Sequence, residues 1–211
     1  MTRSKILIPA SASIAAVVIL LAGAAYLFDL PPFSAKRGEI KAGSVCDSLG
    51  STSQTVKALQ KILPDEPSYS FDDDVNIRVD DSDDSYRSDC FVAGDNGQLL
   101  SARTEMMRAE PAKEWVSSEV REHEPEAQSL TSFATGYEGV ASSNVAAVSV
   151  PCTTEGQVPG GPYNLSVIIQ LKQHREAGRG KLREGLIELA KNAAAFAHQK
   201  ARCDQPSKIT Q

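Results

Sequence analysis

The sequence predicts an α+β protein, in which an N-terminal transmembrane helix is followed by an ectodomain of antiparallel sheet and helices. Three observations indicate this fold class. Residues 6–28 contain no charged side chain, and such a run is long enough to cross a bilayer core of about 30 Å. Beyond residue 43, apolar residues alternate as in strands in some segments and recur at helical spacing in others. All four cysteines lie beyond the apolar run, which indicates disulfides.

The apolar run is interpreted as a signal anchor that stays on the mature chain. A helix of this length rises roughly 34 Å at 1.5 Å per residue. The alternative is a cleaved signal peptide, because Arg3 and Lys5 precede the run and Ala22-Gly23-Ala24 resembles a cleavage site. The run exceeds the ~7–15 apolar residues of an ordinary signal peptide, which favours the anchor. Residues 1–5 are then cytoplasmic and residues 29–43 form a linker.

Basic residues flank the apolar run on both sides, so the positive-inside rule alone does not fix its orientation. The cysteines decide the expected orientation instead. An even set, Cys46, Cys90, Cys152 and Cys203, favours an oxidising compartment and two disulfides. A zinc site is the alternative, but zinc ligands usually come in close pairs, and these cysteines are more than forty positions apart. We therefore expect a single-pass protein of the cell membrane with an extracytoplasmic domain at 44–203 and a polar tail at 204–211.

The charge balance limits the partners. The formal net charge is −5, and residues 1–41 hold five basic and two acidic side chains, so the remainder carries −8. An acidic domain argues against nucleic acid and against docking on anionic headgroups. The expected partners are the membrane, through the N-terminal helix, and an envelope protein or a small ligand.

Local patterns predict the elements of the first half of the domain. Ser51-x-x-Gln54 matches a capping box, and Asp95-Asn96-Gly97 is typical of a hairpin turn. In order, we expect a helix with Val56, Leu59 and Leu63 on one side that ends at Pro64, a strand with Val75, Ile77 and Val79, strands at 90–93 and 98–106, and a helix from Pro111 that carries Trp115, Val116 and Val120.

The second half is expected to repeat this order with strands at 133–140, 145–152 and 163–172 and a loop at 157–162. A closing helix then places Leu182, Leu186, Leu189, Ala193 and Phe196 on one face. This order suggests two related β-β-β-α units with an extra helix after Cys46. The alternative is an α+β domain without internal symmetry.

Four cysteines allow three pairings. We expect Cys46–Cys90 with Cys152–Cys203, because each bond then joins a flanking helix to a strand within its own half. The main rival, Cys46–Cys203 with Cys90–Cys152, would join the chain ends and the two halves.

The cysteine positions also carry a resemblance. One cysteine precedes the first helix, one lies on a mid-chain strand, Gly136-x-x-Gly139 leads to the apolar stretch 146–152, and the last helix ends at Cys203. This arrangement resembles uncharacterised actinobacterial single-pass membrane-anchored or secreted proteins with a four-cysteine α+β extracytoplasmic domain. The resemblance implies topology and disulfides; it implies no activity and no catalytic residue.

The acidic stretch 65–89 holds ten carboxylates, which raises the question of calcium. Counted from Asp81, Tyr86 stands where the turn glycine of a calcium loop should be, and counted from Asp72, Ile77 does. We expect a solvated acidic surface without a tight metal site, although weak, unspecific cation binding stays open.

No pattern indicates catalysis. His123, His174 and His198 have no nucleophile or second ligand at motif spacing, and G-x-S-x-G is absent. We expect no catalytic residue, cofactor or metal, and a binding or accessory protein of the cell envelope. The alternatives are an extracytoplasmic enzyme whose site assembles from distant residues and a structural subunit that docks on another membrane protein through the span.

Overall fold

The computed structural model describes residues 23, 37–50, 53–123 and 130–209. Residues 1–37 and 38–211 form two separate compact units, and the fold below is that of the second. Apart from Gly23, the predicted span at 6–28 lies outside the described residues, as does Ser51 of the capping box. Among the helices that the structure describes, none is both long and apolar enough to cross a membrane.

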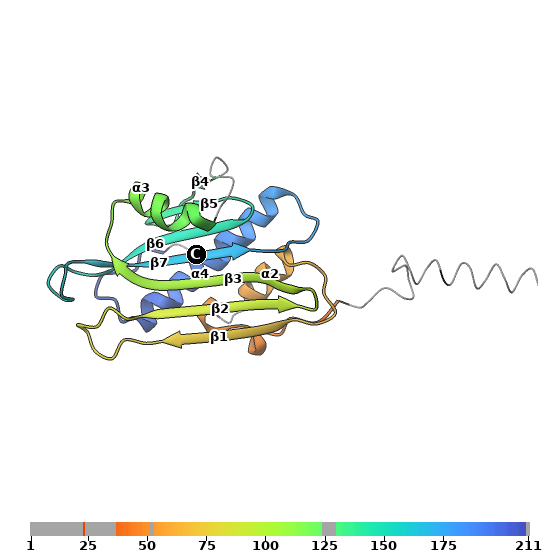
Figure 1. Ribbon diagram of the computed structural model, residues 1–211, viewed down its shortest axis with the longest axis horizontal. Coiled ribbons are helices and arrows are strands. Elements are labelled where there is room, and N and C mark those ends of the chain that lie inside the picture. Colours follow the sequence, from red (N-terminus) through yellow and green to blue (C-terminus); the bar gives the residue numbers. More distant parts are fainter. Residues whose placement is uncertain (1–22, 24–36, 51–52, 124–129, 210–211) are drawn as a thin grey trace, which may run out of the picture. The chain divides into compact units, whose positions relative to one another are not determined.

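A single antiparallel sheet of seven strands forms the centre of the domain (Figure 1). The strands lie in the order β1-β2-β3-β7-β6-β5-β4, and every neighbouring pair is antiparallel. Their bounds are β1 Ser70–Asn76, β2 Arg87–Gly94, β3 Gly97–Arg108, β4 Thr131–Ser132, β5 Glu138–Ala141, β6 Val145–Thr153 and β7 Tyr163–Leu171. The predicted α+β class with an antiparallel sheet is confirmed.

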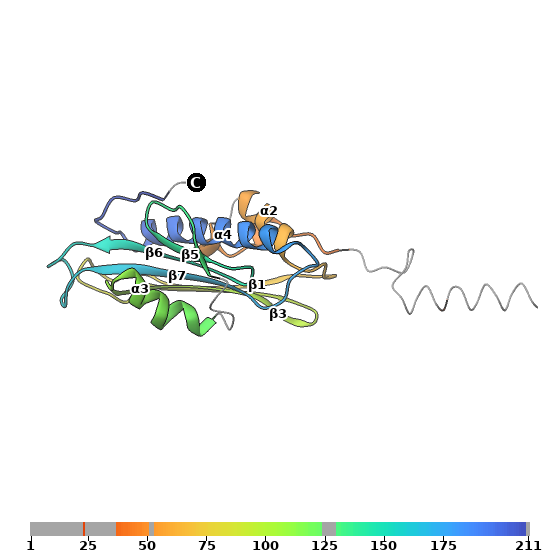
Figure 2. The ribbon, with the colours of Figure 1, turned by 90° about the horizontal axis from the view of Figure 1, so that it is seen from above.

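Helices cover both faces of this sheet. Figure 2 shows α2 and α4 on one face and α3 on the other. The helical segments are η1 Ala42–Ser44, η2 Asp47–Leu49, α2 Ser53–Ile62, α3 Ala112–Trp115, its continuation as η3 Val116–Val120 and η4 Arg121–His123, and α4 Arg179–Lys200. The predicted closing helix is therefore confirmed as α4.

Strand β6 explains why there are two cores. Ala146 and Val148 point to the α4 side and belong to the main core with Leu186, whereas Val145 and Ala147 belong to a smaller cluster with Trp115. Successive side chains on a strand point to opposite faces, so a strand covered on both faces carries a near-continuous apolar run, here residues 145–148. On the smaller side, the indole Nε1 of Trp115 donates to Ser166 Oγ at 2.9 Å.

The strand order matches the two-unit hypothesis only in part. β1-β2-β3 and β5-β6-β7 are each an antiparallel meander, and their third strands, β3 and β7, are neighbours. If the two units were related by symmetry, a two-fold axis perpendicular to the sheet would exchange β3 with β7. Such a rotation keeps every element on the face of the sheet where it started. The helices that follow, α3 and α4, lie on opposite faces (Figure 2), so this axis does not relate them.

The predicted disulfide pairing is confirmed. Cys46 is bonded to Cys90 on β2, and Cys152 on β6 is bonded to Cys203, just beyond α4. Each bond ties a helical segment to a strand within its own half of the chain.

Three local predictions are wrong. Ile77 and Val79 are not in a strand, because β1 ends at Asn76 and the chain turns around Arg78. Of the strand predicted at 133–140, only residues 138–140 are in a strand, β5, since residues 133–137 connect β4 to β5. Phe196 is only half-buried, whereas Ala193 is buried as predicted. Ala194 and Ala197 complete the buried face in place of Phe196, because small side chains let the helix lie close to the sheet.

Candidate functional site

The acidic stretch is divided among several local structures. Asp80 Oδ1 accepts hydrogen bonds from Ser82 N and Ser82 Oγ, each within 2.8 Å, and Asp83 accepts from Val79 N at 2.7 Å and Ser85 N at 2.8 Å. These bonds hold the pKa of both carboxyls below the ordinary value. Within the described ranges, no group of three or more His, Cys, Asp or Glu side chains is placed to hold a metal ion.

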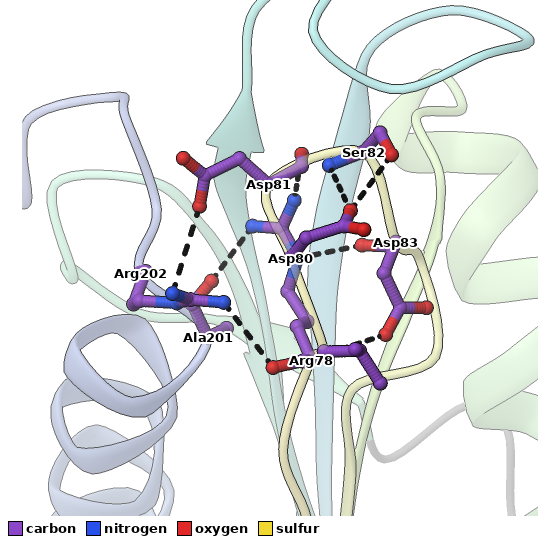
Figure 3. Close-up of polar contacts among 8 residues, drawn as sticks. Arg78, Asp80, Asp81, Ser82, Asp83, Ala201 and Arg202 are labelled. Atoms are coloured by element: carbon purple, nitrogen blue, oxygen red, sulfur yellow. Dashed lines mark hydrogen bonds and ion pairs between the residues drawn. The ribbon is translucent and has the colours of Figure 1, made fainter.

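The turn between β1 and β2 is built around a buried arginine. We name residues 77–86 the Arg78 loop. Arg78 is 3% exposed, and its guanidinium donates to three backbone oxygens: Nε to Asp83 at 2.5 Å, Nη1 to Ala201 at 2.8 Å and Nη2 to Asp81 (Figure 3). A buried charge is costly unless it is hydrogen-bonded, and these carbonyls satisfy it. The loop is therefore fastened to the end of α4.

The end of α4 is shaped to receive this loop. Arg202 has φ +51°, and the Cys203 and Arg202 amides donate to the oxygens of His198 and Gln199, both at 3.2 Å. These two bonds and the left-handed residue make a Schellman motif, in which glycine is usual. Arg202 then reaches back, since its Nη2 donates to the Arg78 oxygen at 3.2 Å and its Nη1 lies 3.9 Å from Asp81 Oδ1 (Figure 3).

Two apolar side chains project from the Arg78 loop. Ile77 is 59% exposed and Val79 is 86% exposed. With Arg78, Gln199, Lys200 and Arg202 they line an open hollow of about 520 Å³. We call Ile77, Val79, Gln199, Lys200 and Arg202 the loop–helix surface. It combines an apolar pair with two cations from the end of α4, and the loop itself carries the carboxylates of Asp80, Asp81, Asp83 and Asp84.

The loop–helix surface lies at the end of the domain opposite the point where the chain enters it. Gly38 N donates to Glu66 O at 2.8 Å, just before β1 begins. The seven residues of β1 then carry the chain roughly 23 Å away, to the Arg78 loop (Figure 1). The surface is therefore well separated from Gly38.

The three histidines do not come together. The His123 backbone oxygen accepts from Gln170 Nε2 at 2.8 Å, His174 lies in the loop after β7, and the His198 ring contacts Gln205 O at 2.9 Å. The structure places them at three separate parts of the domain.

Sequence reasoning missed Arg78 and the loop–helix surface. The one available signal is an arginine flanked by two β-branched apolar residues inside an acidic stretch, and that alternation is also typical of a strand. Comparison with protein-family models, curated proteins and solved structures finds no match to this chain. The resemblance to uncharacterised actinobacterial membrane-anchored or secreted proteins stays a prediction.

Proposed function

We propose that this protein is a membrane-anchored, extracytoplasmic accessory protein of the cell envelope, which is not an enzyme and binds a partner protein through its loop–helix surface. One observation carries the proposal: Ile77 and Val79 are exposed on a loop that Arg78 holds in a fixed shape. Exposed apolar side chains that gather on a surface mark interaction sites more often than isolated ones do.

The energetics favour binding at this surface. Complete burial of an Ile or Val side chain contributes about 1.5–3 kcal/mol, and a loop that is already ordered loses little entropy when it binds. Lys200 and Arg202 flank the pair on the α4 side, and Arg202 already lies near Asp81, so the complementary partner offers an apolar centre with an acidic side chain opposite Lys200. The two disulfides support a compartment outside the cytoplasm, and the predicted span at 6–28 would supply the anchor.

Co-purification from native membranes tests the surface. The full-length chain and an Ile77→Asp/Val79→Asp variant are compared, together with a Gln54→Asp/Gln60→Asp control that adds the same charge to the exposed side of α2. We expect one protein to co-purify with the wild type and the control and to be lost from the loop variant. Equal recovery by all three would contradict the proposal and favour docking through the span.

Topology is tested separately. An impermeant thiol reagent, applied to intact cells after reduction, is expected to label the cysteines. Labelling that requires lysis would place the domain in the cytoplasm and contradict the proposed localisation.

A further inference from the structure

A second hollow lies on the sheet face opposite α4. It measures about 220 Å³, and strands β2, β3 and β7 form most of its lining. Across the strands, Phe91, Ser101 and Gln170 form one row of paired residues, and Asp89, Arg103 and Ile168 form the next. Trp115 and Val120 pack against Ile168. His123, at the end of the same helical segment, lines the hollow, and its backbone oxygen accepts from Gln170 Nε2 at 2.8 Å.

A buried carboxylate orients the arginine in this hollow. Asp89 is 7% exposed and accepts from Arg87 Nε at 2.6 Å and from Arg103 Nε at 3.1 Å. Burial raises the pKa of Asp89, but the two arginines outweigh it, so the net pKa lies below the ordinary value. Asp89 is therefore ionised at neutral pH and holds both guanidinium groups by their Nε atoms.

Arg103 is left with free donors. Its side chain is 48% exposed, and within the described part of the chain its terminal nitrogens Nη1 and Nη2 make no hydrogen bond. A guanidinium fixed at Nε presents these two nitrogens as a fork that fits a carboxylate or phosphate. The arrangement is pre-organised for one oxyanion.

The charges around the hollow are uneven. Lys172 lines its rim, with Nζ 2.5 Å from Gln170 Oε1, and adds a second cation on the β3–β7 side. Asp72 and Asp74 on β1 pair with Phe91 and Asp89 on β2. Their negative charge therefore lies on the β1 side of the hollow, away from β3 and β7. Between the two sides stands Phe91, which is 39% exposed and offers an apolar face.

We propose that this hollow binds a small organic anion, whose oxyanion contacts Arg103 and Lys172 and whose planar apolar part lies against Phe91. The site is separate from the loop–helix surface and does not depend on the proposed docking function. The oxyanion belongs to a carboxylate or a phosphate ester, which share the geometry that the arginine fork recognises.

The site is tested by titrating the full-length protein in mild detergent and measuring binding by calorimetry or NMR. The probes are benzoate and phenyl phosphate, with benzamide as the uncharged analogue of benzoate. We expect at least one anion to bind saturably with one-to-one stoichiometry, and benzamide to bind at least tenfold more weakly because it lacks the charge that Arg103 recognises. Saturable binding of neither anion, or of benzamide equally well, would overturn the proposal.

Variants assign the binding to these residues. Arg103→Gln is expected to weaken anion binding about tenfold, and Lys172→Gln about threefold. Phe91→Ala should weaken the aromatic anion more than inorganic phosphate. The control is Arg175→Gln, which removes the same charge from the surface near α2, where Arg175 pairs with Asp65. Equal losses in the control and in Arg103→Gln would show a general charge effect and would also overturn the proposal.

Discussion

Arg78 and Ala201 lie 123 positions apart in the sequence, and the Nη1 atom of Arg78 donates to the Ala201 backbone oxygen at 2.8 Å. This bond joins the Arg78 loop to the last residue of the α4 helix region, next to the Cys152–Cys203 disulfide. A loop between two antiparallel strands would otherwise be held only by its own turns. The relationship makes the shape of the loop–helix surface depend on the end of α4.

Replacement of Arg78 by glutamine is expected to destabilise the domain by about 2–4 kcal/mol, because buried carbonyls lose their donor and each unpaired group costs about 1–3 kcal/mol. Arg78→Lys should recover only part of the loss, since an ammonium lacks the planar fork that reaches all three oxygens. Denaturant unfolding measures both variants. Arg175→Gln, which removes a half-exposed ion pair, should cost less than about 1 kcal/mol, and a similar cost for Arg78→Gln would refute the anchoring role.

The left-handed backbone of Arg202, with φ at +51°, is expected to lower the free energy of unfolding for any residue other than glycine at this position. Both Arg202→Gly and Arg202→Ala remove its contacts with Arg78 O and Asp81, so the difference between the two variants isolates the backbone. We expect the glycine variant to be more stable than the alanine variant by about 1 kcal/mol, because only glycine adopts this conformation freely. Thermal unfolding of the pair checks this, and an alanine variant as stable as glycine would contradict it.

Much of the fold follows from local sequence. The turn at residues 95–97 joins β2 to β3 as predicted, the apolar stretches at 145–152 and 163–172 are central strands, and α4 has its predicted apolar spacing. The disulfide partners were also predictable, since each pair flanks a few consecutive elements of one half.

What the sequence did not reveal depends on distant parts of the chain. The burial of Arg78 requires the carbonyl of Ala201, which no local pattern indicates. Likewise, the side on which α3 lies depends on how β6 and β7 divide their side chains between two faces, because both strands are buried along most of their length. The hollow beside Arg103 likewise depends on how β2, β3 and β7 align, so its lining residues are far apart in the sequence and no local pattern connects them.

Acid is expected to destabilise the domain below about pH 4. Asp80, Asp83 and Asp89 have pKa values below the ordinary 3.8 in the folded state, so in acid the unfolded chain binds more protons than the folded chain. Their stabilisation is complete above that value and is lost as the pH falls through the folded-state pKa values. Urea unfolding at pH 7, 5 and 3 measures the decline, which should be smaller in Asp89→Asn. A variant with the same pH dependence as the wild type would exclude Asp89 as a contributor.

Gly185 is expected to tolerate no side chain, because a Cβ there would lie 2.4 Å from Ile62 Cγ2 where α4 crosses α2. Gly185→Ala should destabilise the domain by about 1–3 kcal/mol, although alanine favours helices. Gly180→Ala is the matched control, since nothing lies within 4 Å of its Cβ, and it should be neutral or stabilising by up to about 1 kcal/mol. Chemical unfolding measures the stability of both variants. Equal effects at both glycines would show that α2 and α4 do not approach each other as closely as described.

Loss of the Cys152–Cys203 disulfide is expected to loosen the Arg78 loop as well as α4. The bond closes a loop with a sequence separation of 51 residues, for which chain entropy gives on the order of 4 kcal/mol. Without it, the segment with Ala201 and Arg202 loses its attachment to β6, and the contacts that hold Arg78 weaken with it.

Hydrogen exchange on a Cys152→Ser/Cys203→Ser variant measures this coupling. The amides of Val79, Ser82 and Ser85, which are bonded within the loop, should exchange faster than in the wild type. The Cys46→Ser/Cys90→Ser variant is the matched control, because that disulfide ties the start of the domain to β2 and does not touch the end of α4. If both variants leave loop exchange unchanged, or accelerate it equally, the loop does not depend on the end of α4. Faster exchange only in the first variant would show that the Ile77–Val79 pair owes its fixed presentation to a contact made 123 positions away.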